Sequence, residues 1–291
     1  MKPSPFVLHR PRTLLQALDL LAATDNARVI AGGQSLMPML NMRLAAPDNL
    51  VDLNAIEELG YIREDQGEIA IGAMTRQRDI EFSGLIADRL PLMKEAILQV
   101  GHRQTRNRGT LGGSLCHLDP SAEMPTVMMA MDATLHVQSS RGSRALAMSA
   151  FAEGLMATAL QPDEMLTQIR VRPWGPAHGW CFVEFARRHG DFAVVSAAAL
   201  VELDREGRIA RASLTLGGLA ATPLRNPAAE SALLGQSDES GFAAAAAHVQ
   251  PCNALDDPAF PSWYRRRLAT RLLRRAIGGA FQRAKARQPN P

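Results

Sequence analysis

The chain has 291 residues, of which 46% are hydrophobic and 21% charged, a size and composition typical of a protein with two compact domains. Its apolar runs are shorter than the roughly 20 residues of a membrane-spanning helix, and its first residues lack a secretory signal, so we expect no membrane span and a cytoplasmic location. A net charge of +3 without a DNA-binding motif argues against a nucleic-acid partner.

The first half of the chain predicts a mixed α+β domain. A Thr-x-x-Gln capping box followed by leucines at helical spacing predicts a helix over 13–23. The apolar run 29–31 predicts a buried strand that ends in a Gly-Gly turn, Ser35 is expected to cap a short helix, and 50–53 is a second strand. Further elements are expected as strands over 68–71, 104–107, 134–138 and 165–171, with a helix over 92–99.

The second half predicts a different arrangement. Two prolines and a glycine within 173–176 break regular structure, so we expect the domains to be 1–174 and 175–291. The elements expected after this break are antiparallel strands over 179–188, 192–203 and 208–217, then helices over 228–234, 242–248 and 262–283. Arginines are concentrated on the last of these helices, where we expect a solvated or partner-facing surface.

Two glycine-rich segments carry the chemistry that the sequence offers. They are Ala31-Gly32-Gly33-Gln34-Ser35 and Thr110-Leu111-Gly112-Gly113-Ser114. Paired glycines let the backbone turn sharply and present bare N–H groups, which suits a pyrophosphate, so the two segments predict two nests for the two phosphates of a dinucleotide. Each segment alone also fits an ordinary turn, and neither matches the dinucleotide-binding or P-loop fingerprint.

Taken together, several segments resemble the FAD-binding medium subunits of molybdenum hydroxylases. The family includes carbon monoxide dehydrogenase, quinoline 2-oxidoreductase and the flavin domain of xanthine dehydrogenase. The segments are the two glycine-rich ones, Leu50-Val51-Asp52-Leu53, the run 117–125 and the run 187–193. The resemblance implies a two-subdomain FAD-binding domain of the vanillyl-alcohol-oxidase (PCMH) type, followed by a smaller C-terminal domain with an antiparallel sheet and helices.

The resemblance also implies where FAD is bound. Residues 31–35 match the first pyrophosphate-binding loop and 110–114 the second. Glu123 matches an acidic residue that accepts hydrogen bonds from the adenosine ribose, which agrees with the capacity of a carboxylate to accept from two hydroxyls. The expected FAD-binding residues are Ala31, Gly32, Gly33, Gln34, Ser35, Thr110, Leu111, Gly112, Gly113, Ser114, Asp119, Glu123 and Phe192.

Three of these positions have further interpretations. Asp119 lies beside the ribose-binding position, and Asp119-Pro120 fits a helix cap as well as a flavin contact. Phe192 matches a position close to the isoalloxazine ring, where it would cover or gate one face, although a phenyl ring in an apolar strand also fits the core. Some family members have a lysine on the preceding strand where this chain has Val183-Glu184.

The resemblance implies a complex, expected as a dimer of heterotrimers. A small subunit would carry two 2Fe-2S clusters and a large subunit the molybdenum-pterin cofactor, and FAD would pass electrons to an external acceptor. Cys116, Cys181 and Cys252 are too far apart in sequence to form an iron-sulfur or zinc site, so the clusters are expected in another chain. No catalytic residue and no metal ligand are predicted in this chain.

Two other functions fit the same fold. A stand-alone flavin oxidase or reductase would place its own acid, base or covalent histidine at the flavin, and the histidines of this chain show no such pattern. A scaffold subunit without flavin would have no use for the paired glycines and Glu123.

Overall fold

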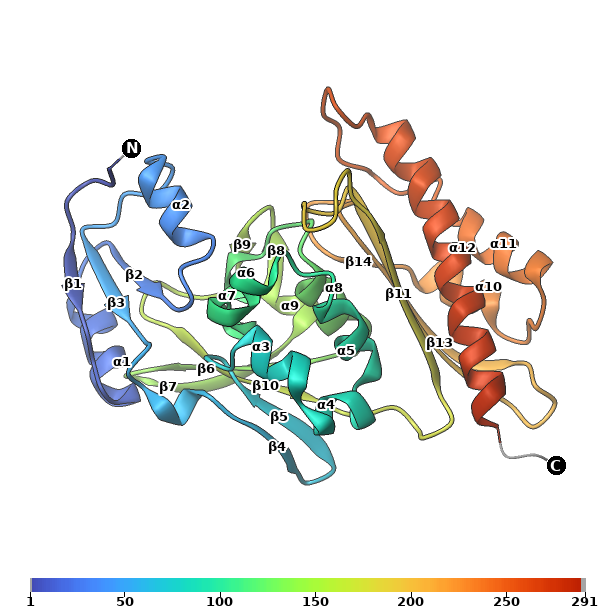
Figure 1. Cartoon of the computed structure of the whole chain (residues 1–291), viewed down its shortest axis with the longest axis horizontal. Helices are drawn as coiled ribbons and strands as arrows, with labels where there is room; N and C mark the ends of the chain where they lie inside the picture. The colour runs from blue at the N-terminus through green and yellow to red at the C-terminus, as the bar shows by residue number, and fades with distance from the viewer. Residues whose placement is uncertain (1, 289–291) are drawn as a thin grey trace.

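The computed structural model describes residues 2–288. Figure 1 shows three parts in a row: a small N-terminal subdomain, a central part around a five-stranded sheet, and a C-terminal part in which the long helix α12 (Ser262–Arg287) lies along a four-stranded sheet. The predicted α+β class is confirmed.

The N-terminal subdomain is a parallel sheet with two helices. Its strands, in the order β1-β3-β2, are β1 (Val7–His9), β3 (Asn49–Asp52) and β2 (Ala27–Ile30), and its helices are α1 (Leu14–Ala23) and α2 (Leu36–Asn41). The predicted strand-helix-strand unit is therefore confirmed. The expected cap by the Ser35 side chain is wrong, because Ser35 has a helical backbone (φ −101°, ψ −45°) in which its hydroxyl accepts no capping hydrogen bond.

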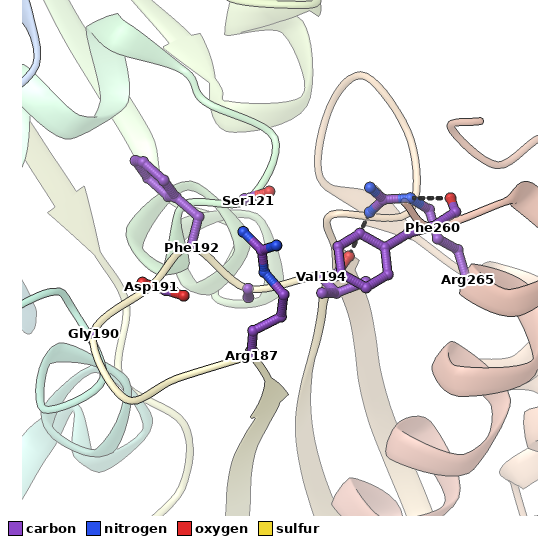
Figure 2. A pocket seen from close by; sticks show the side chains of 9 residues that line it. Ser121, Arg187, Gly190, Asp191, Phe192, Val194, Phe260 and Arg265 are labelled. Carbon is purple, nitrogen blue, oxygen red and sulfur yellow. Dashed lines mark hydrogen bonds between the residues drawn. The ribbon is translucent and has the colours of Figure 1, made fainter. Parts of the chain in front are cut away.

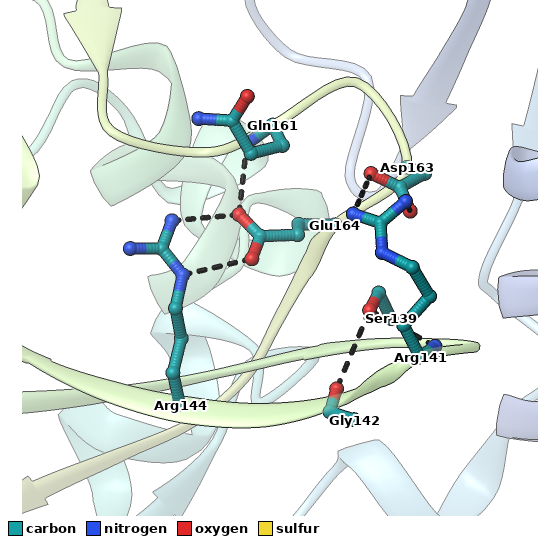
Figure 3. Close-up of polar contacts among 7 residues, drawn as sticks. All are labelled: Ser139, Arg141, Gly142, Arg144, Gln161, Asp163 and Glu164. Carbon is teal, nitrogen blue, oxygen red and sulfur yellow. Dashed lines mark hydrogen bonds and ion pairs between the residues drawn. The ribbon is translucent and has the colours of Figure 1, made fainter.

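The central part surrounds an antiparallel sheet. The strands, in spatial order, are β4 (Ile62–Asp65), β5 (Glu68–Gly72), β10 (Met165–Val171), β6 (Thr134–Ser139) and β7 (Gly142–Ala147). Two ion pairs, Arg144 with Glu164 and Arg141 with Asp163, each at 2.7 Å, fasten the β6–β7 hairpin to the loop before β10 (Figure 3).

Short helices and turns fill the rest of the central part. They are η1 (Glu57–Leu59), α3 (Gln77–Phe82), α4 (Gly84–Arg89), α5 (Pro91–Ile97), α6 (Arg103–Arg108), α7 (Leu111–His117), α8 (Glu123–Ala130) and α9 (Met148–Phe151), with the small hairpin β8 (Ala152–Gly154) and β9 (Ala157–Thr158).

The strand predicted over 104–107 is wrong, since these residues belong to α6. The reason is tertiary: Arg106 points inward and its Nε donates to Oε2 of Glu81 at 2.8 Å, while its Nη1 donates to the carbonyl of Val100. Both charged side chains are buried, at 8% and 7% exposure. The helical backbone of α6 directs the Arg106 side chain to the buried carboxylate of Glu81. No local pattern in the sequence identifies Glu81 as the partner, because it lies 25 residues away.

The C-terminal part is the predicted antiparallel meander. Its strands are β11 (Gly179–Phe185), β12 (Val195–Leu203), β13 (Ile209–Gly217) and β14 (Leu224–Arg225), and its helices before α12 are α10 (Pro227–Leu233) and α11 (Glu239–Ala247). The strands expected over 179–188 and 192–203 are shorter than predicted, so residues 186–194 form a loop. Residues 182, 198 and 200 pack into the central core, which joins the two parts.

Candidate FAD-binding site

The two glycine-rich segments meet in space. A Cβ atom on Gly32 would lie 2.1 Å from the carbonyl oxygen of Arg108, and one on Gly113 would lie 3.7 Å from the Cβ of Ala31. The backbone after β2 therefore packs directly against the backbone between α6 and α7. Only glycine permits the approach at position 32.

A polar network holds this contact together. Arg76 donates to the carbonyl of Arg108 at 2.5 Å and to Oδ1 of Asn54 at 2.6 Å, and Asn54 donates to the carbonyl of Ala31 at 2.9 Å. Sequence reasoning missed both Asn54 and Arg76. The position of Asn54 could have identified it. Asn54 follows β3, which runs parallel to β2 and therefore ends at the same edge of the sheet.

The first loop presents open donors. Gly33 has φ +71°, a conformation that favours glycine. Within residues 2–288, the backbone N–H groups from Gly32 to Ser35 donate to no other protein atom. Gly32, Gly33 and Ser35 are half-buried and Gln34 is exposed. Partly buried amides without protein acceptors fit an anionic ligand such as a pyrophosphate, because buried N–H groups are otherwise almost always paired.

The second segment differs from the expectation of a second nest. It is the first turn of α7, and its amides from Leu111 to Ser114 donate in turn to the carbonyls of Thr75 and Ala73 and to the hydroxyl and carbonyl of Thr110. Its backbone N–H donors are therefore already paired with protein acceptors. What it offers to a ligand is the half-buried hydroxyl of Ser114 and a close approach to the first loop.

Asp119 and Glu123 follow α7 on a tight connection. Leu118 ends the helix in the left-handed region, and Oδ1 of Asp119 accepts from the amide of Ser121 at 2.8 Å. Helix α8 begins later, with Ala122 at its N-cap, so the helix-cap interpretation of Asp119 is wrong. An Asx turn takes its place, because the Asp119 carboxylate bonds two residues on.

Glu123 is the buried carboxyl of the site. It is 5% exposed, and burial raises its pKa to about 7, with the charge of Asp119 adding to the shift and a bond to its own amide opposing it. Within residues 2–288 it forms no ion pair, so it has spare acceptor capacity, which fits the two hydroxyls of a ribose.

Phe192 lies in the loop between β11 and β12 and is 62% exposed, so the core interpretation is wrong. Ser121, Arg187, Phe260 and Arg265 line a pocket beside it. Figure 2 shows the Phe192 ring pointing away from Arg187 and Phe260, toward the helices of the first domain. An exposed phenyl ring at this position is available to cover a planar ligand.

Arg265 anchors this loop. Its Nη1 donates to the carbonyls of Val194 and Gly218, at 2.6 and 2.8 Å, and its Nη2 donates to Oδ2 of Asp257 at 2.6 Å. It is 8% exposed, so the expectation that the arginines near 265 form a solvated or partner-facing surface is wrong at this position. Its acceptors are mostly carbonyl groups, which no sequence pattern identifies.

The cysteines and histidines form no further centre in the described chain. Among residues 2–288, no group of three or more His, Cys, Asp or Glu side chains is placed to hold a metal ion. Burial raises the pKa of the Cys116 thiol to about 12, which keeps it protonated. No helix in that range has the length and apolar character needed to cross a membrane.

Comparisons with known proteins identify the family of the chain. Residues 4–174 match the FAD binding domain in molybdopterin dehydrogenase, and residues 180–280 match the CO dehydrogenase flavoprotein C-terminal domain. These matches define an oxidoreductase subunit of the FAD-containing class. More narrowly, the chain belongs to the family of FAD-binding medium subunits of molybdenum hydroxylases.

The similarity to individual relatives extends over nearly the whole chain. It is similar to the 6-hydroxypseudooxynicotine dehydrogenase complex subunit alpha of Paenarthrobacter nicotinovorans (38% identical, covering 98% of this chain and 97% of that protein) and to the carbon monoxide dehydrogenase medium chain of Afipia carboxidovorans (36%, covering all of both). Similar solved structures are carbon monoxide dehydrogenase from Hydrogenophaga pseudoflava (TM-score 0.94, 34% identity, 97% and 99% covered) and quinoline 2-oxidoreductase from Pseudomonas putida 86 (TM-score 0.93, 36%, 98% and 99%).

Proposed function

We propose that this chain is the electron-transfer subunit of a molybdenum hydroxylase complex, holding FAD between partner clusters and an external acceptor. The observation that carries the proposal is the junction of the two glycine-rich segments, where the amides of 32–35 are open. These amides would hold the pyrophosphate, with the hydroxyls of Ser35 and Ser114 beside them. Glu123 would accept from the ribose and Phe192 would lie beside the isoalloxazine ring.

The bound FAD would supply the redox chemistry, collecting electrons from 2Fe-2S clusters of a small subunit and releasing them to the acceptor. The residues of this chain bind and orient it: the first loop and Ser114 fix the phosphates, Glu123 the ribose, and the loop 186–194 the surroundings of the ring. A large subunit with the molybdenum-pterin cofactor would bear the substrate, in a dimer of heterotrimers. We also propose that the boundary between the two domains lies between residues 174 and 175 and that the protein is located in the cytoplasm.

The proposal is tested on the reconstituted complex. Substrate should reduce the external acceptor only when all three subunits and FAD are present. After removal of FAD, substrate should still reduce the iron-sulfur clusters in a single turnover while the acceptor stays oxidised. Oxidation of an organic substrate by the isolated chain at a comparable rate would favour the stand-alone flavin enzyme instead.

Retention of the cofactor gives a second test. We expect one FAD per chain, bound without a covalent link, so denaturation should release all the yellow colour into solution. Colour that remains with the precipitated protein would contradict this.

A further inference from the structure

A group of buried oxygen atoms without partners lies where the two domains meet. Within residues 2–288, Oε2 of Glu184, Oγ of Ser196 and Oγ1 of Thr215 are buried and form no hydrogen bond. Ser196 and Thr215 are completely buried. Because unpaired buried polar atoms are rare, their concentration at one interface requires an explanation.

These side chains converge with Glu123. Glu184 lies directly opposite Ser196 in the β11–β12 pair, so both side chains point to the same face of the sheet. Ser196 Oγ and Thr126 Oγ1 both lie within 2.5 Å of the point where a Cβ on Gly217 would stand. Thr126 is three residues after Glu123 on α8, hence on the same side of that helix.

Within residues 2–288 neither Glu123 nor Glu184 forms an ion pair, and the nearby His117 lies 4.0 Å from Asp119 instead. The charge that acts on Glu184 is that of Glu123, and Glu123 in turn faces Asp119. Of the other charged groups packed against β11, Glu95 from α5 and Arg283 from α12 are paired with each other, Arg287 lies over the ring of Trp180, and Arg275 lies near Cys181. Two buried carboxyl groups beside each other are not both ionised at low cost, as one proton relieves the repulsion.

We propose that Glu184 stays protonated while Glu123 is ionised, which makes Glu184 a positioning residue for the ribose-binding carboxylate. The proposal rests on the function proposed above, in which Glu123 accepts from the ribose. A neutral Glu184 leaves the negative charge of Glu123 unopposed and ready for the ribose hydroxyls, whereas an ionised Glu184 repels it.

The ionisation of the two groups agrees with this assignment. Burial, and then the charge of Glu123, raise the pKa of Glu184 to about 8, while burial raises the pKa of Glu123 to about 7. In this range one of the two carboxyls is protonated, and it is Glu184, because no hydrogen-bond donor within residues 2–288 reaches its buried Oε2 to stabilise a charge. Below this window a protonated Glu123 accepts weaker hydrogen bonds from the ribose, and above it an ionised Glu184 repels the charge of Glu123. Affinity for FAD should therefore be greatest between pH 7 and 8.

The test is the dissociation constant of FAD from the full-length apoprotein between pH 6 and 9.5, measured by quenching of flavin fluorescence. We expect the affinity of the wild type to fall on both sides of the optimum, by up to about tenfold per pH unit. Glu184→Gln, which is neutral at every pH, should bind FAD within about threefold of the wild type at pH 7.5 and lose the alkaline decline. Glu153→Gln, at an exposed position, is the control and should show the same decline in FAD affinity on both sides of the optimum as the wild type.

The outcomes separate this inference from the proposed function. An alkaline decline in affinity that persists unchanged in Glu184→Gln overturns the assignment of the proton to Glu184. Wild-type affinity in Glu123→Gln at pH 7.5 instead overturns the ribose assignment. If Glu184→Gln does not fold, infrared difference spectra of the wild type decide the matter: a protonated carboxyl band should be present at pH 7.5 and disappear above pH 8, and its absence at pH 7.5 contradicts the inference.

Discussion

Gly32 lies so close to Arg108 that a methyl group on its Cα would stand 2.1 Å from the Arg108 carbonyl oxygen. The same carbonyl accepts from Arg76, so it is fixed from both sides. The open amides from Gly32 to Ser35 are therefore positioned by a backbone-to-backbone contact between the N-terminal subdomain and the α6–α7 connection, and this loop cannot accept a side chain at position 32.

Gly32→Ala should therefore reduce FAD loading. Because the obstacle is a fixed carbonyl, the loop must shift, and we expect a loss of about 1–3 kcal/mol in the free energy of unfolding together with FAD content well below one per chain. Absorbance of the purified protein and urea unfolding measure the two effects. Gly84→Ala is the matched control, since nothing lies within 4 Å of its added Cβ. Full flavin content in Gly32→Ala would remove this contact from the site.

Phe192→Ala should alter the flavin without destabilising the fold. The side chain is 62% exposed, so its removal should change the free energy of unfolding by no more than about 0.5 kcal/mol. If the ring lies beside the isoalloxazine, the visible spectrum of the bound flavin and its rate of reoxidation should both change. Phe82→Ala, at 64% exposure on α3, should leave both unchanged. An unaltered flavin spectrum in Phe192→Ala would place the ring elsewhere.

The stability of the apoprotein should depend on pH through Glu184. Its pKa of about 8 in the folded chain exceeds the ordinary value of 4.5, so between these pH values the folded state binds more protons than the unfolded state. The contribution of Glu184 to stability is therefore complete below pH 4.5 and is lost as the pH rises to 8. Urea unfolding at several pH values should show that the free energy of unfolding of Glu184→Gln increases relative to that of the wild type as the pH rises. A constant difference across this range would contradict the raised pKa.

Arg106→Met should be the most destabilising of these changes. It leaves Glu81 as a buried carboxylate without its main partner, at a cost of about 3–5 kcal/mol. Adding Glu81→Gln to Arg106→Met removes the uncompensated charge and should recover part of the loss, as a thermal or urea unfolding series would show. A double variant no more stable than Arg106→Met would mean that packing, rather than charge, dominates.

The sequence was informative wherever local pattern decides structure. Apolar runs and glycine pairs predicted the β2-α2-β3 unit, the C-terminal meander and the mixed α+β class. The α6 helix escaped prediction because its inward side depends on the distant partner Glu81, and the Thr110–Ser114 segment was misjudged because its acceptors at residues 73 and 75 are far away in sequence. The structure shows that the two glycine-rich segments meet in space. The roles of the expected FAD-binding residues toward the cofactor stay predictions.

Because residues of both sheets share one buried cluster, we expect the chain to unfold as one unit. Phe182, Ala198 and Leu200 belong to the C-terminal sheet by sequence but to the central cluster by packing, and the carbonyl of Pro120 accepts the amide of Gly218 across the junction. A cut near residue 175 would uncover this apolar face on both fragments, so neither is expected to persist alone in solution. The break predicted near residue 175 therefore lies between two sheets that share one core, and we do not expect the protein to separate there.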